Sequence, residues 1–156
     1  MTLLLEILSI IAIIASLFAF LYYQKKKAAK RRHDEMQNRF NEMARQEGLD
    51  ITEQEHLDIA IIGHDTERNI LLFVTSDAWE EIPVKKVKLD DITSCKITNK
   101  INYGTAISEI RLDLEGRIQR ASLLFYRNHS EGDLGVAHLG ASAETWQKLV
   151  LKNMGR

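Results

Sequence analysis

The chain has 156 residues, of which 45% are hydrophobic and 28% are charged, with eight glycines, one proline and one cysteine. This length suffices for one ordinary domain and an appendage, and the composition is neither collagenous nor disulfide-rich. The net charge of -1 hides an asymmetry, because residues 1–32 carry +5 and residues 33–156 carry -6. A generally basic nucleic-acid binder is therefore excluded, since the cations of such a protein cluster on its folded domain.

Residues 3–23 form an almost uninterrupted apolar run, LLLEILSIIAIIASLFAFLYY. Eighteen of these twenty-one residues are apolar or aromatic. A helix of this length measures roughly 30 Å, which matches the hydrocarbon core of a bilayer. We therefore predict a transmembrane anchor over residues 1–24. A cleaved signal peptide is disfavoured, because the cations follow the apolar run and no site of small residues ends it.

Basic residues follow the apolar run at once: Lys25, Lys26, Lys27, Lys30, Arg31 and Arg32. Cations that flank a span are retained on the cytoplasmic side of the plasma (inner) membrane. We expect a single-pass protein with its N-terminus outside and its remaining chain in the cytoplasm. Tyr22 and Tyr23 suit the interfacial aromatic belt, and the lysines can reach the headgroups of membrane lipids. Topology alone accounts for this cluster, and a lipid-signalling role is the less favoured alternative.

Glu6 is the one ionisable residue inside the predicted span, and an intramembrane carboxylate is a candidate functional site. It lies one turn from the outer end, however, and a span that starts at Ile7 would still be long enough. We favour a place for Glu6 in the membrane interface. The alternative is a polar contact with another membrane subunit.

Residues 25–48 are predicted to form a basic juxtamembrane segment and an amphipathic connecting helix. Met36, Phe40 and Met43 recur at i, i+4 and i+7, which gives one narrow apolar stripe, and Gly48 supplies a stop. The stripe is too short to identify a coiled coil. We therefore favour packing within the protomer over pairing with a second copy.

Residues 49–156 change to short β-rich runs separated by turn signals, which indicates an antiparallel β domain. The clearest run is 107–115, where Ile110, Leu112 and Leu114 alternate with charged residues, as in a strand with one face in solvent. The remaining runs are 57–63, 69–75, 82–89, 93–99 and 117–126, with a weak strand at 134–138.

A C-terminal helix closes the pattern, with Ser142 as its expected N-cap and Trp146 and Val150 on its apolar face. The runs are not separated by helices that could serve as parallel crossovers. We therefore predict an antiparallel barrel or sandwich of about seven strands with a C-terminal helix.

This order of elements, with Trp146 on the apolar face of the last helix, resembles the pleckstrin-homology-like (PH-like) fold. The segments IAIIGHDTERNILLF and VKKVKLDDITSCKI also look like those of small bacterial membrane proteins with a PH-like cytosolic domain. The resemblance covers residues 57–154 and implies that fold and a membrane-anchored bacterial protein. Domains of this kind that bind phosphoinositides have a basic first loop, whereas residues 64–68 carry two acids and one arginine. Headgroup recognition is therefore not indicated, since it needs several convergent cations.

The sequence offers no pattern for catalysis, for a cofactor or for a metal. The histidines form no close ligand pair, and Cys95 has no second cysteine to complete a zinc site. The pair His64 and Asp65 is typical of a turn, and Cys95 is expected to be a buried small hydrophobe. We therefore predict a non-enzymatic protein with no catalytic, cofactor-binding or metal-binding residues.

By elimination, we expect the cytosolic domain to bind a protein partner or a second copy of itself, as an accessory or scaffold subunit of a membrane complex. The candidate contacts are Trp79 in a predicted loop, and Val84, Lys86 and Lys88 on a predicted edge strand. The alternative is a sensor that holds a small ligand or lipid inside the barrel. An enzyme with an unfamiliar site ranks third.

Overall fold

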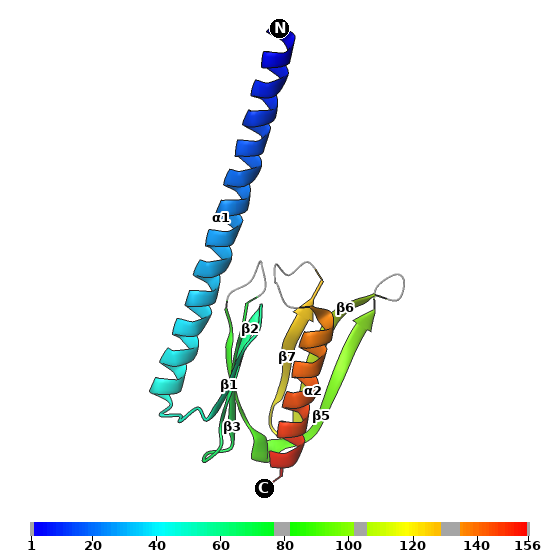
Figure 1. Cartoon of the computed structure of the whole chain (residues 1–156). Helices are drawn as coiled ribbons and strands as arrows, with labels where there is room; N and C mark the ends of the chain where they lie inside the picture. Colours follow the sequence, from blue (N-terminus) through cyan, green and yellow to red (C-terminus); the bar gives the residue numbers. More distant parts are fainter. Residues whose placement is uncertain (1, 77–81, 102–105, 129–134, 156) are drawn as a thin grey trace. The chain divides into compact units, whose positions relative to one another are not determined.

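The computed structural model of the chain (Figure 1) describes residues 2–76, 82–101, 106–128 and 135–155, and their side chains from residue 11 onward. Its elements are, in chain order, α1 (Thr2–Gln46), β1 (Glu53–His56), β2 (Ala60–Asp65), β3 (Ile70–Thr75), β4 (Val84–Lys88), a short 3-10 helix (Leu89–Asp91), β5 (Ile92–Ile101), β6 (Ile107–Gly116), β7 (Arg120–Arg127) and α2 (Val136–Asn153). The chain divides into two units, residues 1–34 and residues 35–156.

The first unit consists of the N-terminal part of α1. From Ile11 to Tyr23, nine large apolar or aromatic side chains are exposed by 49% to 71%. The basic residues from Lys25 to Arg32 are exposed as well. Within the residues whose side chains are described, no helix is long and apolar enough to cross a membrane. Residues 3–10 of the predicted span, Glu6 included, lie outside that described set.

The second unit contains two antiparallel sheets and α2. Sheet A has the strand order β1-β2-β3-β4, and sheet B has the order β5-β6-β7. A core of apolar side chains from both sheets and from α2 fills the space between them, with Phe73, Phe125 and Trp146 among its largest members. The predicted antiparallel strands and C-terminal helix are thus confirmed.

The alternation predicted for residues 107–115 is confirmed in β6. Ile110, Leu112 and Leu114 are at most 2% exposed and belong to the core. Glu109 and Arg111 point to the other face and pair with each other. Sheet B therefore has one buried face and one polar face in solvent.

Sheet A differs, because β2 and β3 are buried along almost their whole length on both faces. Met36 and Phe40 of α1 are 1% exposed and pack on Ile61 and Leu72, which lie on the outer face of this sheet. The stripe predicted on the connecting helix is therefore packed within the protomer. A second copy is not needed to cover it.

At Gly63 of β2, the side chain of Phe40 from α1 packs directly on the backbone of sheet A. A Cβ atom at Gly63 would lie 2.6 Å from Cζ of Phe40 and 2.9 Å from Cγ2 of Ile51. Such distances are shorter than van der Waals contact, so only glycine lets the helix lie this close.

The start of α2 corrects two predictions. The weak strand at 134–138 is wrong in its described part, because Val136 begins α2, and the N-cap is Gly135 instead of Ser142. The reason is that Leu139 and Ala143 are buried, which extends the apolar face of the helix a turn earlier than Trp146. The seventh strand is β1, a polar edge strand that the periodicity of apolar residues could not indicate.

The C-terminal end of α2 is tied to the turn between β2 and β3. Asn69 has a φ of +53°, and its Nδ2 donates to the backbone carbonyl oxygen of Asn153 at 2.8 Å. Asn69 also donates to Asp90 in the short 3-10 helix. A helix end leaves carbonyl groups unpaired, so this side chain satisfies one of them.

Substituting Gly63→Ala should destabilise the protein by about 1–3 kcal/mol, because the added methyl group must displace Phe40 or Ile51. The measurement is urea unfolding of the full-length chain in mild detergent. Gly140→Ala is the matched control, since a Cβ at Gly140 lies 3.9 Å from the nearest atom, in a helix interior. It should stabilise by about 0.5–1 kcal/mol. Equal midpoints for Gly63→Ala and the unsubstituted chain would contradict the close packing.

Candidate functional site

A groove of about 440 Å³ lies between β1 and α2. Its walls come from two elements that are far apart in the sequence but adjacent in the fold. The lining residues are Glu53, Gln54 and Glu55 of β1, and His138, Ala141, Ser142, Thr145, Trp146 and Leu149 of α2.

Glu55 joins the two walls of this groove. Its carboxylate accepts hydrogen bonds from Oγ of Ser142 at 2.6 Å and from Nε1 of Trp146 at 2.5 Å. Trp146 is 4% exposed, and its indole N–H needs an acceptor when the ring is buried. Glu55 therefore holds β1 against α2, and both of its bonds come from neutral donors.

The main chain of β1 is paired on one side. Within the described strands β1 is the terminal strand of sheet A and has β2 as its neighbour. Leu57 N–H bonds to the carbonyl of Ala60, and the register pairs Glu55 with Ile62. Because bonded and non-bonded pairs alternate in an antiparallel ladder, the main chain of Gln54 points away from β2. The groove thus runs along an open strand edge.

The charges that line the groove are acidic. Glu53 and Glu55 contribute carboxylates, and the lining set contains no lysine or arginine. Neither residue takes part in the ion pairs formed among the described residues. The groove therefore carries negative charge, and no lysine or arginine among the described residues forms an ion pair with Glu53 or Glu55.

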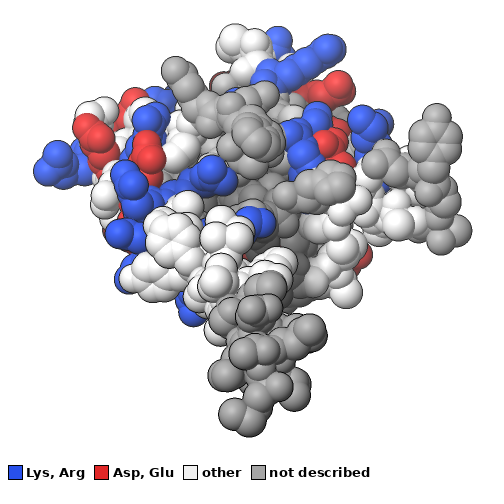
Figure 2. All heavy atoms as spheres, turned by 90° about the horizontal axis from the view of Figure 1, so that it is seen from above, with Lys and Arg blue, Asp and Glu red and all other residues white. Residues whose placement is uncertain are grey.

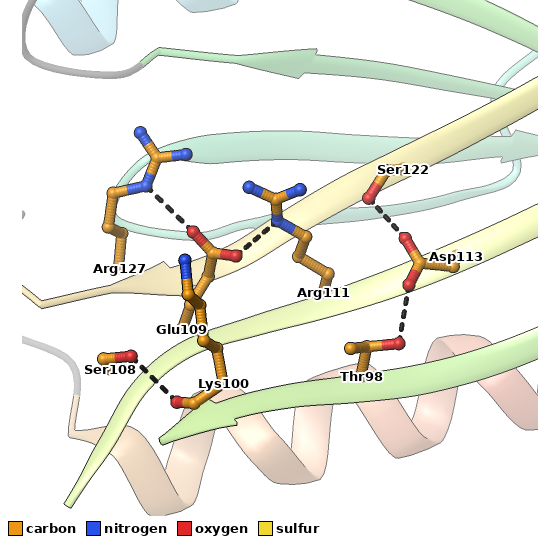
Figure 3. Close-up of polar contacts among 8 residues, drawn as sticks. All are labelled: Thr98, Lys100, Ser108, Glu109, Arg111, Asp113, Ser122 and Arg127. Carbon is orange, nitrogen blue, oxygen red and sulfur yellow. Dashed lines mark hydrogen bonds and ion pairs between the residues drawn. The ribbon is translucent and has the colours of Figure 1, made fainter. Parts of the chain in front are cut away.

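The solvent-exposed face of sheet B carries a second polar cluster, shown in Figure 3. Glu109 lies between two arginines, with Nε of Arg111 at 2.6 Å and Nε of Arg127 at 3.2 Å. The Arg111 contact is an ion pair outside hydrogen-bond geometry. Asp113 accepts hydrogen bonds from Thr98 at 2.6 Å and from Ser122 at 2.5 Å. The pair of Glu109 and Arg111 lies within β6, whereas the contacts of Glu109 with Arg127 and of Asp113 with Thr98 and Ser122 join neighbouring strands and tie the sheet together.

The face of the molecule drawn in Figure 2 carries both acidic and basic side chains. On the face seen in Figure 2, red and blue side chains lie beside one another. Mixed charge of this kind differs from the continuous basic field that phosphate groups of a nucleic acid attract.

Three of the predicted contact residues, Val84, Lys86 and Lys88, lie in β4, at the edge of sheet A opposite to β1. Trp79 falls outside the described residues. Val84 is partly buried against the cluster formed by α1, and Nζ of Lys86 pairs with Glu47 at 2.6 Å. Lys88 is exposed, and among the described strands β4 lies at the edge of its sheet, as predicted. Their role in binding a partner stays a prediction.

Asp65 bonds the backbone around it, as expected for a turn residue. Its carboxylate accepts the N–H groups of Asp50 and Arg68, each at 2.9 Å. Burial acts to raise the pKa of Asp65, but these backbone hydrogen bonds and the charge of Arg68 outweigh it, so the pKa lies below its usual value. The neighbouring His64 is 1% exposed, and its Nε2 lies 3.4 Å from Oδ1 of Asn69.

Cys95 is a buried member of the core, 7% exposed, as its place in a predicted strand indicates. Burial raises the pKa of the Cys95 thiol to about 11, and the charge of Asp113 adds to this effect. The described residues contain no group of three or more His, Cys, Asp and Glu side chains that could hold a metal ion.

The sequence did not point to the groove. Glu53, Gln54 and Glu55 lie in a polar stretch before the first predicted strand, and the sequence predicts a helix-capping role for Ser142. One signal was present, because Trp146 on the apolar face of a helix implies an acceptor for its indole N–H. Comparison with protein-family models, curated proteins and solved structures gives no significant match to this chain.

Cys95 should react slowly with an alkylating reagent at pH 8 in the folded chain, because only the thiolate attacks and its pKa is raised to about 11. Mass spectrometry of the intact chain measures the rate. In concentrated urea the same thiol should react at the rate of a free cysteine, with Cys95→Ser as the blank. Equal rates in both solvents would contradict the burial.

Asp65→Asn should cost about 1 kcal/mol of stability at pH 7, because a charged acceptor is replaced by a neutral one. The pKa of Asp65 in the folded chain lies below the usual value of 3.8, so its carboxylate stabilises the folded state above that pH. This contribution is lost as the pH falls through the folded pKa.

Urea unfolding of both chains between pH 7 and pH 3 measures the effect. The stability difference between them should shrink on acidification. If the stability difference between the two chains grows towards low pH, the pKa of Asp65 is not lowered by folding.

Proposed function

We propose that this protein is a single-pass membrane protein whose PH-like domain lies on the cytoplasmic side and binds a protein partner close to the bilayer. It would act as an accessory or scaffold subunit of a membrane complex, without catalysis. The observation that carries the proposal is the exposed apolar surface of α1 between Ile11 and Tyr23.

This surface is costly in water. Leaving one large apolar side chain in solvent forgoes roughly 1.5–3 kcal/mol, and nine of them are exposed in this stretch. A helix that is apolar on all sides is either buried in protein or placed in a membrane. A bilayer is the environment in which these side chains are stable, and the helical backbone satisfies its own hydrogen bonds there.

The length and flanks of the helix support the same proposal. The apolar run of residues 3–23 belongs to the single helix α1, and the basic residues from Lys25 to Arg32 continue it. Basic residues beside a span favour the cytoplasmic side. This order supports an outside N-terminus and a cytoplasmic domain.

The domain supports binding at its surface. Four strands, three strands and a C-terminal helix are consistent with the PH-like resemblance. The space between the sheets is filled by apolar side chains such as Phe73, Phe125 and Trp146. Protein binding on the surface is therefore favoured over a ligand held inside the barrel.

Membrane fractionation tests the proposal. The full-length chain should sediment with membranes and stay there in alkaline carbonate, which strips peripheral proteins. The double substitution Ile13→Lys and Ile14→Lys should move it to the soluble or degraded fraction, because both positions lie at the centre of the run 3–23, where a charge is costly. Ile118→Lys with Leu151→Lys is the matched control, since both are exposed apolar residues of the domain.

The control should stay in the membrane. Release of the unsubstituted chain by carbonate, or equal behaviour of the two double variants, would overturn the proposal.

A further inference from the structure

We infer that the groove between β1 and α2 binds an extended, basic segment of another membrane protein, which adds as a strand to the open edge of β1. The inference rests on the proposed function, because the anchor supplies the partner's location. It names the partner by chemistry: a backbone in extended conformation with lysine or arginine side chains.

The extended conformation follows from the edge of β1. The main chain of Gln54 points away from β2 into the groove, so it offers an N–H and a carbonyl group to a further strand. A segment that adds to a sheet edge gains main-chain hydrogen bonds, and its alternate side chains fill the pockets beside the edge.

The second wall suits such a segment. Ala141, Thr145 and Leu149 follow one another at intervals of four residues, so they form one face of α2 along the groove. Ala141 and Thr145 are exposed, and Leu149 is partly buried. This wall is small and mostly apolar, so it leaves room for side chains on one side of an added strand.

The basic character follows from the charge of the groove. Glu55 receives two neutral donors, Ser142 and Trp146, so its negative charge stays uncancelled, and Glu53 adds a second carboxylate at the same edge. Complementary charge at an interface steers association and rejects acidic partners.

The location of the partner follows from the membrane. Cytoplasmic segments that flank membrane spans are enriched in lysine and arginine. A domain anchored beside the bilayer meets such segments at high effective concentration. An acidic groove on this domain therefore has basic juxtamembrane segments as its most accessible complementary ligands.

The test uses the full-length chain in nanodiscs of phosphatidylcholine, a neutral lipid that does not itself attract cations. The probe is a fluorescent peptide of about seven residues, a usual strand length, in which lysine alternates with threonine or valine. Fluorescence anisotropy measures binding, with empty nanodiscs as the blank. The lysine peptide should bind, and the same peptide with glutamate in place of lysine should not.

Two comparisons examine the site and the mode of binding. Glu53→Lys should weaken binding of the lysine peptide about tenfold or more, because it reverses a charge in the groove. Glu67→Lys is the matched control, an exposed acid in the turn between β2 and β3, and it should leave binding unchanged. A peptide methylated on alternate backbone nitrogens should bind far more weakly, because those donors are lost.

The inference is overturned if the lysine peptide does not bind, if the glutamate peptide binds as well, if Glu53→Lys has no effect beyond that of Glu67→Lys, or if backbone methylation changes nothing. Its failure can be separated from failure of the proposed function. If the chain stays in the membrane in alkaline carbonate but does not bind the peptide, the inference about the groove is wrong and the proposed membrane anchor still holds.

Discussion

The packing of Phe40 against Gly63 is the contact on which the arrangement of sheet A depends. It brings the last turns of α1 onto a sheet whose outer face carries Ile61, Leu72 and Val74. Without this cover, a contiguous apolar surface would face water, which soluble domains avoid. The end of the connecting helix is therefore part of the domain core, and the domain begins at Glu35, well before the first β-strand at Glu53.

The two edges of sheet A differ in the elements that contact them. At the β4 edge, Lys86 is paired with Glu47 near the end of α1. At the β1 edge, Glu55 is bonded to α2, and the groove leaves the main chain of Gln54 facing outward. The end of α1 thus covers the outer face of sheet A. The β1 edge borders the groove, whose carboxylates are opposite in charge to the basic residues from Lys25 to Arg32.

The sequence predicted those elements whose identity is set by local apolar periodicity. The alternation of Ile110, Leu112 and Leu114 defined β6 and its buried face, and the stripe of Met36 and Phe40 defined the packed face of α1. Both patterns can be read from the sequence because the apolar residues in them are the ones that contact the core. Side chains on one face recur with period 2 in a strand and period 3.6 in a helix.

The elements that the sequence did not predict depend on distant partners. Strand β1 has the sequence EQEH, and its conformation comes from pairing with β2 instead of from its own apolar residues. The groove depends on a hydrogen bond between Glu55 and Ser142, which are 87 positions apart. Such a juxtaposition has no local signal, so only the fold could place the acidic edge beside α2.

Hydrogen exchange of the full-length chain in nanodiscs tests most directly whether the end of α1 belongs to the domain. If it does, amides of residues 36–46 exchange only through global unfolding, with the same free energy as those of β2 and β3. Exchange of residues 36–46 within seconds, while β2 and β3 stay protected, would contradict this account. The helix would then be a linker, and another surface would have to cover the outer face of sheet A.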